Sequence, residues 1–209
     1  MKKNFIVLAA LAIACSATVS AQKFVETFDS NSLEWTECTF DNNENVKAFI
    51  DKGFLTVHSE KNTNIWNGTA SYSTALSTCY APIDVKKSFK ITTHIRYNED
   101  ESLCGMMFNL KDEGTYYMIG LLEANKKIYF QRWENNRLVG GYTQGFPYPK
   151  LKKGQFYELI LESNGGTITL TMEGLPVFKL RYMPLEYAGF GFITHGEQEL
   201  IVDDVVFEQ

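Results

Sequence analysis

The residues best suited to ligand chemistry lie in the run Lys127–Trp133, where aromatic and polar side chains alternate. In an extended strand every second residue points to the same face, so Tyr129, Gln131 and Trp133 would share one face. An aromatic ring can stack on the C–H face of a sugar while a neighbouring amide bonds its hydroxyl groups. The same alternation is typical of core residues beside one polar neighbour at a sheet edge, and the sequence favours neither interpretation.

A second group of polar residues lies in the segment Ser88–Tyr97, which has the clearest alternation in the chain. Its apolar residues would face a core, and Thr92, His94 and Arg96 would point the other way. The simplest interpretation is a strand face exposed to solvent. The alternative is a cluster of hydrogen-bond donors that lines a concave sheet and binds a ligand.

Aromatic residues in the Gly- and Pro-rich segment Gly140–Gly154 provide a third candidate. The segment is predicted to be a loop, and exposed loops often carry binding residues. Tyr142 is the candidate ligand-binding residue in it. Trp66, in a polar stretch earlier in the chain, is a further candidate, whereas Trp35 is predicted to lie in the core.

No residue is assigned a catalytic role. A glycoside hydrolase needs two carboxyl groups about 5 to 10 Å apart. Glu158 and Glu162 share a strand face but would lie about 13 Å apart at about 3.3 Å per residue. Asp203 and Asp204 are adjacent and would point to opposite faces. Carboxylate pairs on neighbouring strands stay open, and no metal site is predicted because the histidines lack the spacing of metal ligands.

The elements that would position these residues are strands. The stretch Leu103–Tyr142 contains four short strands separated by three polar turns, at Lys111–Gly114, Glu123–Asn125 and Glu134–Asn136. Aromatic and branched residues fill the strands, and Asp, Asn and Gly fill the breaks between them. This pattern predicts an antiparallel meander.

Strands are also predicted on the C-terminal side of the meander. Gln155–Glu162 and Thr167–Glu173 flank an Asn-Gly turn signal and are predicted to form a hairpin. Ala188–Thr194 and Glu199–Phe207 are predicted to be the last two strands. No stretch has helical periodicity, and no repeat is present. The sequence therefore predicts a single all-β domain, an antiparallel β-sandwich.

The first residues have the pattern of an export signal. Two lysines precede the apolar run Phe5–Ala14, which is too short to span a membrane, and no other segment is apolar enough to do so. Small residues favour a cut after Ala21, so residues 1–21 are predicted to be a signal peptide and residues 22–209 the folded domain. A competing cut before Cys15 would leave a lipid anchor there. Either cut predicts a periplasmic, outer-envelope or extracellular protein.

Composition narrows the range of partners. The 209 residues carry a net charge of −5 and no basic run, which argues against nucleic acid or an anionic membrane as the partner. Without the leader the cysteines are Cys38, Cys79 and Cys104, so at most one disulfide can form within the chain. Buried free thiols are the favoured interpretation. The oligomeric state is not indicated.

Several short patterns together resemble a known family. The runs Cys104–Asn109, Thr115–Tyr117 and Ile128–Trp133 are similar to successive strands of bacterial concanavalin A-like lectin/glucanase domains, including the LamG and keto-disaccharide hydrolase-like groups. Gly189–Phe192 and Val202–Val205 resemble the closing strands of these domains. The resemblance implies a concanavalin A-like jelly roll and a carbohydrate ligand. It also allows a structural calcium ion, whose ligands the sequence does not place; no other cofactor is predicted.

The resemblance does not fix the activity, because one fold serves many functions. The glucanase signature Glu-x-Asp-x-x-Glu is absent from the sequence. We therefore expect a non-catalytic, lectin-like domain that holds a poly- or oligosaccharide on an aromatic and polar concave sheet face. A glycan-processing hydrolase or lyase of the same superfamily is the first alternative, and a protein-interaction or structural module is the second.

Overall fold

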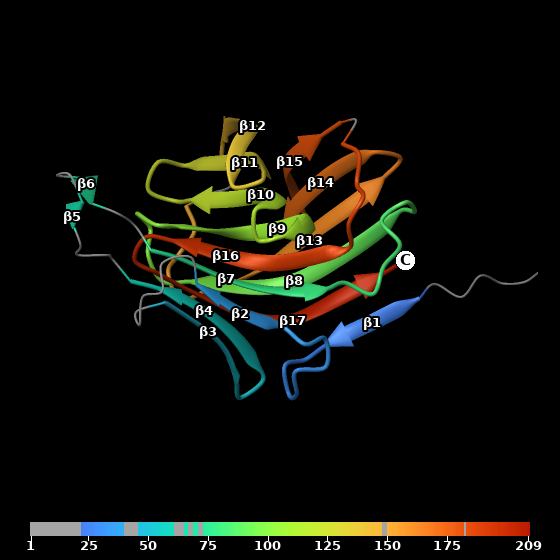
Figure 1. Ribbon diagram of the computed structural model, residues 1–209, viewed down its shortest axis with the longest axis horizontal. Helices are drawn as coiled ribbons and strands as arrows, with labels where there is room; N and C mark the ends of the chain where they lie inside the picture. The colour runs from blue at the N-terminus through green and yellow to red at the C-terminus, as the bar shows by residue number, and fades with distance from the viewer. Residues whose placement is uncertain are drawn as a thin grey trace, which may run out of the picture.

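The computed structural model describes residues 22–39, 46–60, 65–66, 69–70, 73–147, 150–181 and 183–209 (Figure 1). The predicted signal peptide and Cys15 lie outside the described residues, and the side chain of Trp66 is not described either. The described residues form strands connected by turns and loops. None of them belongs to a helix long and apolar enough to cross a membrane.

The strands form two antiparallel sheets, which we call the back sheet and the front sheet. The back sheet has the order β15 (Leu175–Leu180), β14 (Thr167–Met172), β13 (Phe156–Asn164), β8 (Phe89–Tyr97), β17 (Gln198–Glu208), β4 (Phe54–Ser59), β3 (Val46–Asp51), and β1 (Lys23–Glu26) pairs with β17. The front sheet has the order β12 (Arg137–Gly145), β11 (Lys127–Glu134), β10 (Thr115–Leu122), β9 (Leu103–Asp112), β16 (Gly189–His195), β7 (Thr74–Tyr80), β2 (Thr36–Thr39). Two short strands, β5 (Ile65–Trp66) and β6 (Thr69–Ala70), pair separately.

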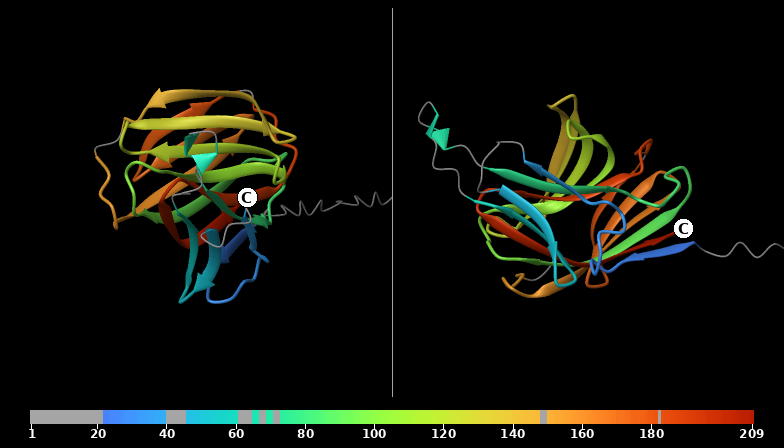
Figure 2. Two further views of the ribbon diagram at one scale, coloured as in Figure 1. Left: turned by 60° about the vertical axis from the view of Figure 1, so that its left-hand side comes forward. Right: turned by 60° about the horizontal axis from the view of Figure 1, so that its bottom comes forward.

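The two sheets pack face to face around one apolar core (Figure 2). β8 shows how the sequence builds this core, because its alternate apolar side chains, Phe89, Ile91, Ile95 and Tyr97, are at most 6% exposed. Thr93 belongs to the same buried row, and the residues that alternate with this row, Lys90, Thr92, His94 and Arg96, point to the outer surface of the back sheet, as the alternation predicted. Burial of apolar surface on this scale is the main driving force for folding.

The front sheet contributes the aromatic half of the core. Phe190 and Phe192 of β16 are almost fully buried, and Trp35 stacks on Phe192 with ring centroids 5.8 Å apart. The prediction that Trp35 lies in the core is therefore confirmed. The predicted meander is confirmed as well, since β9, β10, β11 and β12 are neighbours in the sheet and consecutive in the chain.

The predicted hairpin between β13 and β14 is confirmed. The Asn-Gly signal placed the turn at Asn164 and Gly165, and the observed turn lies one residue later. Asn164 pairs with Thr167, so Gly165 and Gly166 form the two-residue turn. Their φ angles of 57° and 77° are the left-handed values that this turn needs, and glycine adopts them without steric cost.

Two sequence predictions are corrected by the structure. The segment Gly140–Gly154 is not a loop throughout, because β12 continues to Gly145 by pairing with β11. Asp203 and Asp204 do not point to opposite faces. A bulge interrupts the pairing of β17 at these residues, and Val202 and Val205 on either side are both fully buried, which leaves both carboxylates on the outer side. Periodicity alone cannot reveal a bulge.

The described cysteines Cys79 and Cys104 are buried free thiols, as favoured from the sequence. Burial raises the pKa of Cys104 to about 12, and burial together with the nearby Glu26 raises the pKa of Cys79 further. A pKa near 12 leaves roughly one thiol in ten thousand ionised at pH 8.

In a Cys38→Ser variant we expect a thiol reagent at pH 8 to label almost no protein until denaturant is added. Fast labelling of the folded protein would contradict this environment.

Candidate functional site

The outward side of the front sheet carries a second apolar cluster, separate from the core. Its buried members come from four neighbouring strands, and they are Leu76, Met107, Leu110, Tyr116, Met118 and Ile193, with Leu103 and Trp133 packed against them. The register explains the cluster, because Met118 lies opposite Met107, and Ile193 lies opposite Leu76. Apolar residues gathered on the solvent side of a sheet are typical of a binding surface.

A hollow of about 490 Å³ opens over this cluster, and we call it the Trp133 hollow. Its floor is apolar and consists of Leu103, Met118 and Ile193, and its aromatic wall consists of Tyr116 and Trp133. Its rim is polar, with Thr74, Glu113, Gln131, Asn136 and His195. An apolar lining with a few polar groups is the usual composition of a small-molecule site.

The aromatic wall is held in place by stacking and by one hydrogen bond. Tyr116 of β10 and Trp133 of β11 are directly opposite in the register, and their rings stack with centroids 6.2 Å apart and an angle of 19°. Trp133 Nε1 donates to Gln131 Oε1 at 2.9 Å, which fixes the indole orientation. Burial raises the pKa of Tyr116 to about 12, so its hydroxyl stays neutral at physiological pH. The wall is therefore rigid before any ligand arrives.

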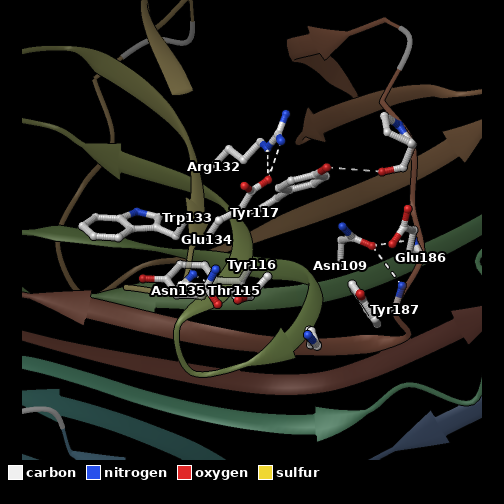
Figure 3. A pocket seen from close by; sticks show the side chains of 12 residues that line it. Asn109, Thr115, Tyr116, Tyr117, Arg132, Trp133, Glu134, Asn135, Glu186 and Tyr187 are labelled. Carbon is white, nitrogen blue, oxygen red and sulfur yellow. Dashed lines mark hydrogen bonds and ion pairs between the residues drawn. The ribbon is translucent and has the colours of Figure 1, made fainter. Parts of the chain in front are cut away.

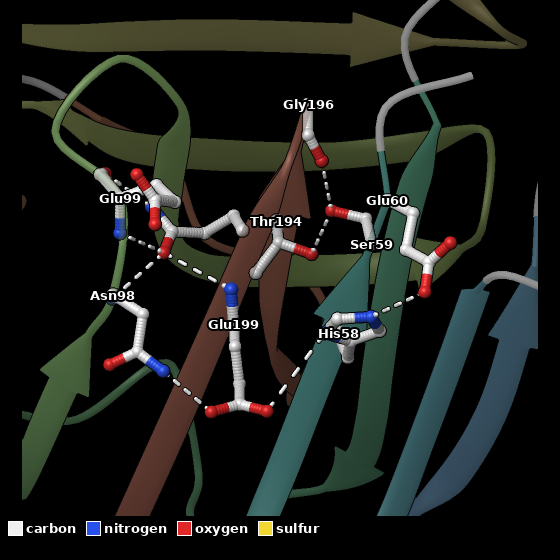
Figure 4. A network of polar contacts seen from close by, with 9 residues as sticks. His58, Ser59, Glu60, Asn98, Glu99, Thr194, Gly196 and Glu199 are labelled. Carbon is white, nitrogen blue, oxygen red and sulfur yellow. Dashed lines mark hydrogen bonds and ion pairs between the residues drawn. The ribbon is translucent and has the colours of Figure 1, made fainter. Parts of the chain in front are cut away.

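The opposite rim is formed by the neighbouring strands β7 and β16. The Thr74 hydroxyl and His195 Nδ1 form a hydrogen bond of 2.8 Å, and the His195 side chain is exposed. A polar network supports this rim from the side (Figure 4): the Ser59 hydroxyl donates to the Gly196 carbonyl at 2.6 Å and lies 2.9 Å from the Thr194 hydroxyl. His195 is thus positioned between two fixed residues.

A second hollow of about 280 Å³ lies on the other side of Trp133 and Tyr116, and we call it the end hollow (Figure 3). The Asn109 side chain shapes it, because Asn109 Oδ1 accepts hydrogen bonds from the backbone amides of Glu186 and Tyr187 at 2.6 and 3.0 Å. Tyr117 donates its hydroxyl to the Pro184 carbonyl at 3.4 Å. These bonds fasten the segment before β16 against the ends of β9 and β10.

The end hollow is lined by as many cations as anions. Arg132 Nε donates to Glu134 Oε1 at 2.9 Å, so these two charges neutralise each other. Lys111 and Glu186 are the remaining charged residues of the lining. A lining of balanced charge offers hydrogen-bonding groups without attracting a ligand of either sign.

Comparisons with known proteins identify the fold. No model of a protein family matches this chain, and no curated protein matches it. Solved structures do match. A Bacillus subtilis protein of unknown function with a galectin-like fold has a TM-score of 0.62 at 13% identity, covering 89% of this chain and 94% of that chain. A prokaryotic β-1,3-1,4-glucanase (lichenase) from a mouse hindgut metagenome has a TM-score of 0.60 at 11% identity. The match covers 88% of this chain and 98% of that chain.

A carbohydrate binding module from Bacillus subtilis is also similar, with a TM-score of 0.52 at 14% identity, covering 81% of this chain and 94% of that chain. The fold is a concanavalin A-like jelly roll. The resemblance proposed from the sequence motifs is confirmed at the level of fold. At these identities the likeness concerns the fold alone.

The jelly roll brings together only part of the predicted site. Gln131 and Trp133 line the Trp133 hollow, and Tyr129 points to the same side from the same strand. The Tyr129 hydroxyl accepts a hydrogen bond of 2.9 Å from Asn125 Nδ2. Tyr142 faces the other way: its ring stacks on Phe178 at 5.4 Å and contributes to packing between the sheets.

The polar residues of β8 lie on the opposite surface of the jelly roll. Thr92, His94 and Arg96 are on the outer side of the back sheet, and the Arg96 guanidinium lies 5.0 Å from the centre of the Phe156 ring. The structure therefore separates these three residues from Trp133. One continuous binding face cannot include both groups.

Several residues of the Trp133 hollow were not among the predicted site residues. Thr74, Leu103, Tyr116, Met118 and His195 come from four strands, of which β7 and β16 are far from the consecutive strands β9 and β10 in the sequence. Period-2 alternation reveals which residues of one strand share a face, but it does not reveal which strands are neighbours. The pair Tyr116-Tyr117 was a signal in the sequence, because one of two adjacent tyrosines in a strand must face outward.

The floor of the hollow lacks carboxylates. β10, β16 and the part of β9 from Leu103 to Leu110 carry no Asp or Glu at outward positions. Among the described residues, Glu113 is the one carboxylate that lines the Trp133 hollow. The described residues also contain no group of three His, Cys, Asp or Glu side chains that could hold a metal ion. The arrangement suits contact with a ligand through stacking and hydrogen bonds.

Proposed function

We propose that this protein is an exported, non-catalytic glycan-binding domain that holds a poly- or oligosaccharide in the Trp133 hollow. The observation that carries the proposal is the pre-oriented aromatic wall of Tyr116 and Trp133 beside a polar rim. A sugar ring needs both features, because its C–H face is apolar and its edge is covered with hydroxyl groups. The export part of the proposal depends on the N-terminal signal pattern in the sequence.

Catalysis is the alternative, since the solved structures of this fold include a lichenase as well as a carbohydrate binding module. Hydrolysis with retention or inversion uses two carboxyl groups on either side of the bond that is cleaved. Glu113 supplies one carboxylate at the rim, and the described floor supplies no second one. This favours binding over cleavage.

The charges favour a neutral glycan. The chain has a net charge of −5, and the end hollow beside Trp133 has a balanced lining. The net negative charge of the chain would repel a polymer of uronic acids or sulfated sugars. The end hollow would offer such a polymer no unpaired cationic site. We therefore expect neutral polysaccharides to bind more tightly than acidic ones.

Affinity electrophoresis of the mature chain, Gln22–Gln209, in gels that contain soluble polysaccharides tests the proposal. We expect retardation by at least one neutral polysaccharide, none by acidic ones, and no newly released sugar ends in the same samples. Gels without polysaccharide control for changes in mobility. Retardation with new sugar ends would show an enzyme, and no retardation by any glycan would favour an interaction module.

A further inference from the structure

The edge strand β12 is unusually open. It pairs with β11 on one side and with no other described strand, so a row of backbone N–H and C=O groups lies along its free edge (Figure 1). From Leu138 to Gly145 it contains no charged residue and no proline. Leu138 and Val139 are 53% and 49% exposed, which is high for large apolar side chains. An open, uncharged, apolar edge favours pairing with another strand.

The edges of the back sheet, in contrast, are protected. β15 carries Pro176 and Lys179, and two of its carbonyls accept hydrogen bonds from side chains of β12, namely Gln144 to Val177 at 2.5 Å and Tyr142 to Lys179 at 3.2 Å. β3, at the other end of the back sheet, carries Lys47 and Asp51. Prolines, charges and capped carbonyls are the usual protection against edge-to-edge pairing. Between Leu138 and Gly145, β12 has no proline and no charge, and its one protective feature is a bulge at Val139.

We propose that β12 pairs antiparallel with β12 of a second copy of this chain, about a two-fold axis. The absence of charge favours an identical partner, because two copies of the same edge meet without like-charge repulsion. Antiparallel pairing places the apolar beginning of one strand, at Leu138 and Val139, beside the end of the other.

The shape of this edge is also suited to a copy of itself. A hollow of about 410 Å³ is lined by Tyr129, Phe130 and Gln131 of β11 and by the residues from Leu138 to Thr143 of β12, so no bulky side chain of the chain itself covers this edge. Gly140 lies in the middle of the strand, and a Cβ atom there would have no heavy atom within 4 Å. No side chain at this point obstructs an approaching strand.

One irregularity limits the pairing to part of the strand. The register between β11 and β12 shifts at Val139, which is a bulge. From Gly140 to Gly145 the pairing with β11 is regular. This regular segment is as long as an average strand, so it is sufficient for a new ladder.

A two-fold axis that relates antiparallel strands is perpendicular to the sheet. The front sheets of the two copies would join into one sheet, and both Trp133 hollows would open on the same side. A polysaccharide could then contact two hollows at once, which strengthens binding without any new contact within one copy.

Sedimentation velocity of the mature chain over a range of concentrations, without any glycan, tests the proposal independently of the proposed function. We expect a reversible dimer. Val139→Lys places a charge on each edge and should weaken dimerisation at least about tenfold. Leu175→Lys, at a residue of β15 that is 52% exposed, is the matched control and should leave the dimer unchanged.

Leu138→Glu serves as a second variant, and circular dichroism of each variant checks that it is folded. A wild-type protein that stays monomeric at the highest concentration would overturn the proposal. So would a folded Val139→Lys or Leu138→Glu variant that dimerises as the wild type does.

Discussion

Alanine at position 133 should lower the affinity for a retarding polysaccharide by about 30-fold or more, equivalent to about 2 kcal/mol. Trp133 lines both the Trp133 hollow and the end hollow, and it stacks on Tyr116. Its removal eliminates the stacking surface for the sugar and leaves Gln131 without its hydrogen-bond partner. The loss can be measured as the change in retardation with polysaccharide concentration in affinity gels.

Two further variants separate stacking from other causes. Trp133→Phe keeps an aromatic ring but removes the N–H donor, so we expect a loss smaller than that of the alanine variant. Arg96→Ala, on the outer side of the back sheet, should leave the affinity unchanged because it lies on the opposite surface. An affinity that falls with Arg96→Ala and survives Trp133→Ala would move the glycan site to the back sheet.

Leucine in place of Gln198 should reduce the free energy of unfolding by about 3 kcal/mol. The Gln198 side chain is 1% exposed and bonds only to backbone groups. Its Oε1 accepts from the amides of Asn98, Glu99 and Glu199 at 3.0, 3.0 and 3.1 Å, and its Nε2 donates to the carbonyls of Glu99 and Ser102 at 2.8 and 3.1 Å. An apolar side chain of similar size leaves these groups without a partner, and each buried unpaired group costs about 1 to 3 kcal/mol.

The expected loss is smaller than the sum of five bonds because part of the loop between β8 and β9 can reach water. Urea unfolding followed by tryptophan fluorescence measures the effect. Gln144→Leu is the matched control, since the Gln144 side chain makes one hydrogen bond, to Val177, at the far edge of the sandwich. We expect about 1 kcal/mol or less there. Equal losses in the two variants would show that the Gln198 contacts do not fasten the loop.

The sequence predicted the fold well wherever a single strand carries its own signal. The alternation in Ser88–Tyr97 and the polar breaks within Leu103–Tyr142 were sufficient to identify β8 and the meander. β3 was not predicted at all, and β12 was predicted as a loop in part, because its glycines have low strand propensity. Pairing with β11 overcomes that propensity.

The site was predicted less completely, for a physical reason. Tyr129, Gln131 and Trp133 lie on one strand, so their common face follows from the period of the strand. Tyr116 and His195 join Trp133 through the register of neighbouring strands, which no local pattern specifies. The same limit explains why Thr92, His94 and Arg96 could not be assigned to a sheet before the structure was known.

The order of strands has a consequence for how the chain folds during its synthesis. The last two strands are the middle of both sheets, since β16 lies between β9 and β7, and β17 lies between β8 and β4. A nascent chain that lacks residues 189–208 can form the meander β9–β12 and the hairpins β3–β4 and β13–β14, but it cannot connect β9 to β7 or β8 to β4. Local contacts therefore form early, and both sheets close only after the C-terminal strands have left the ribosome.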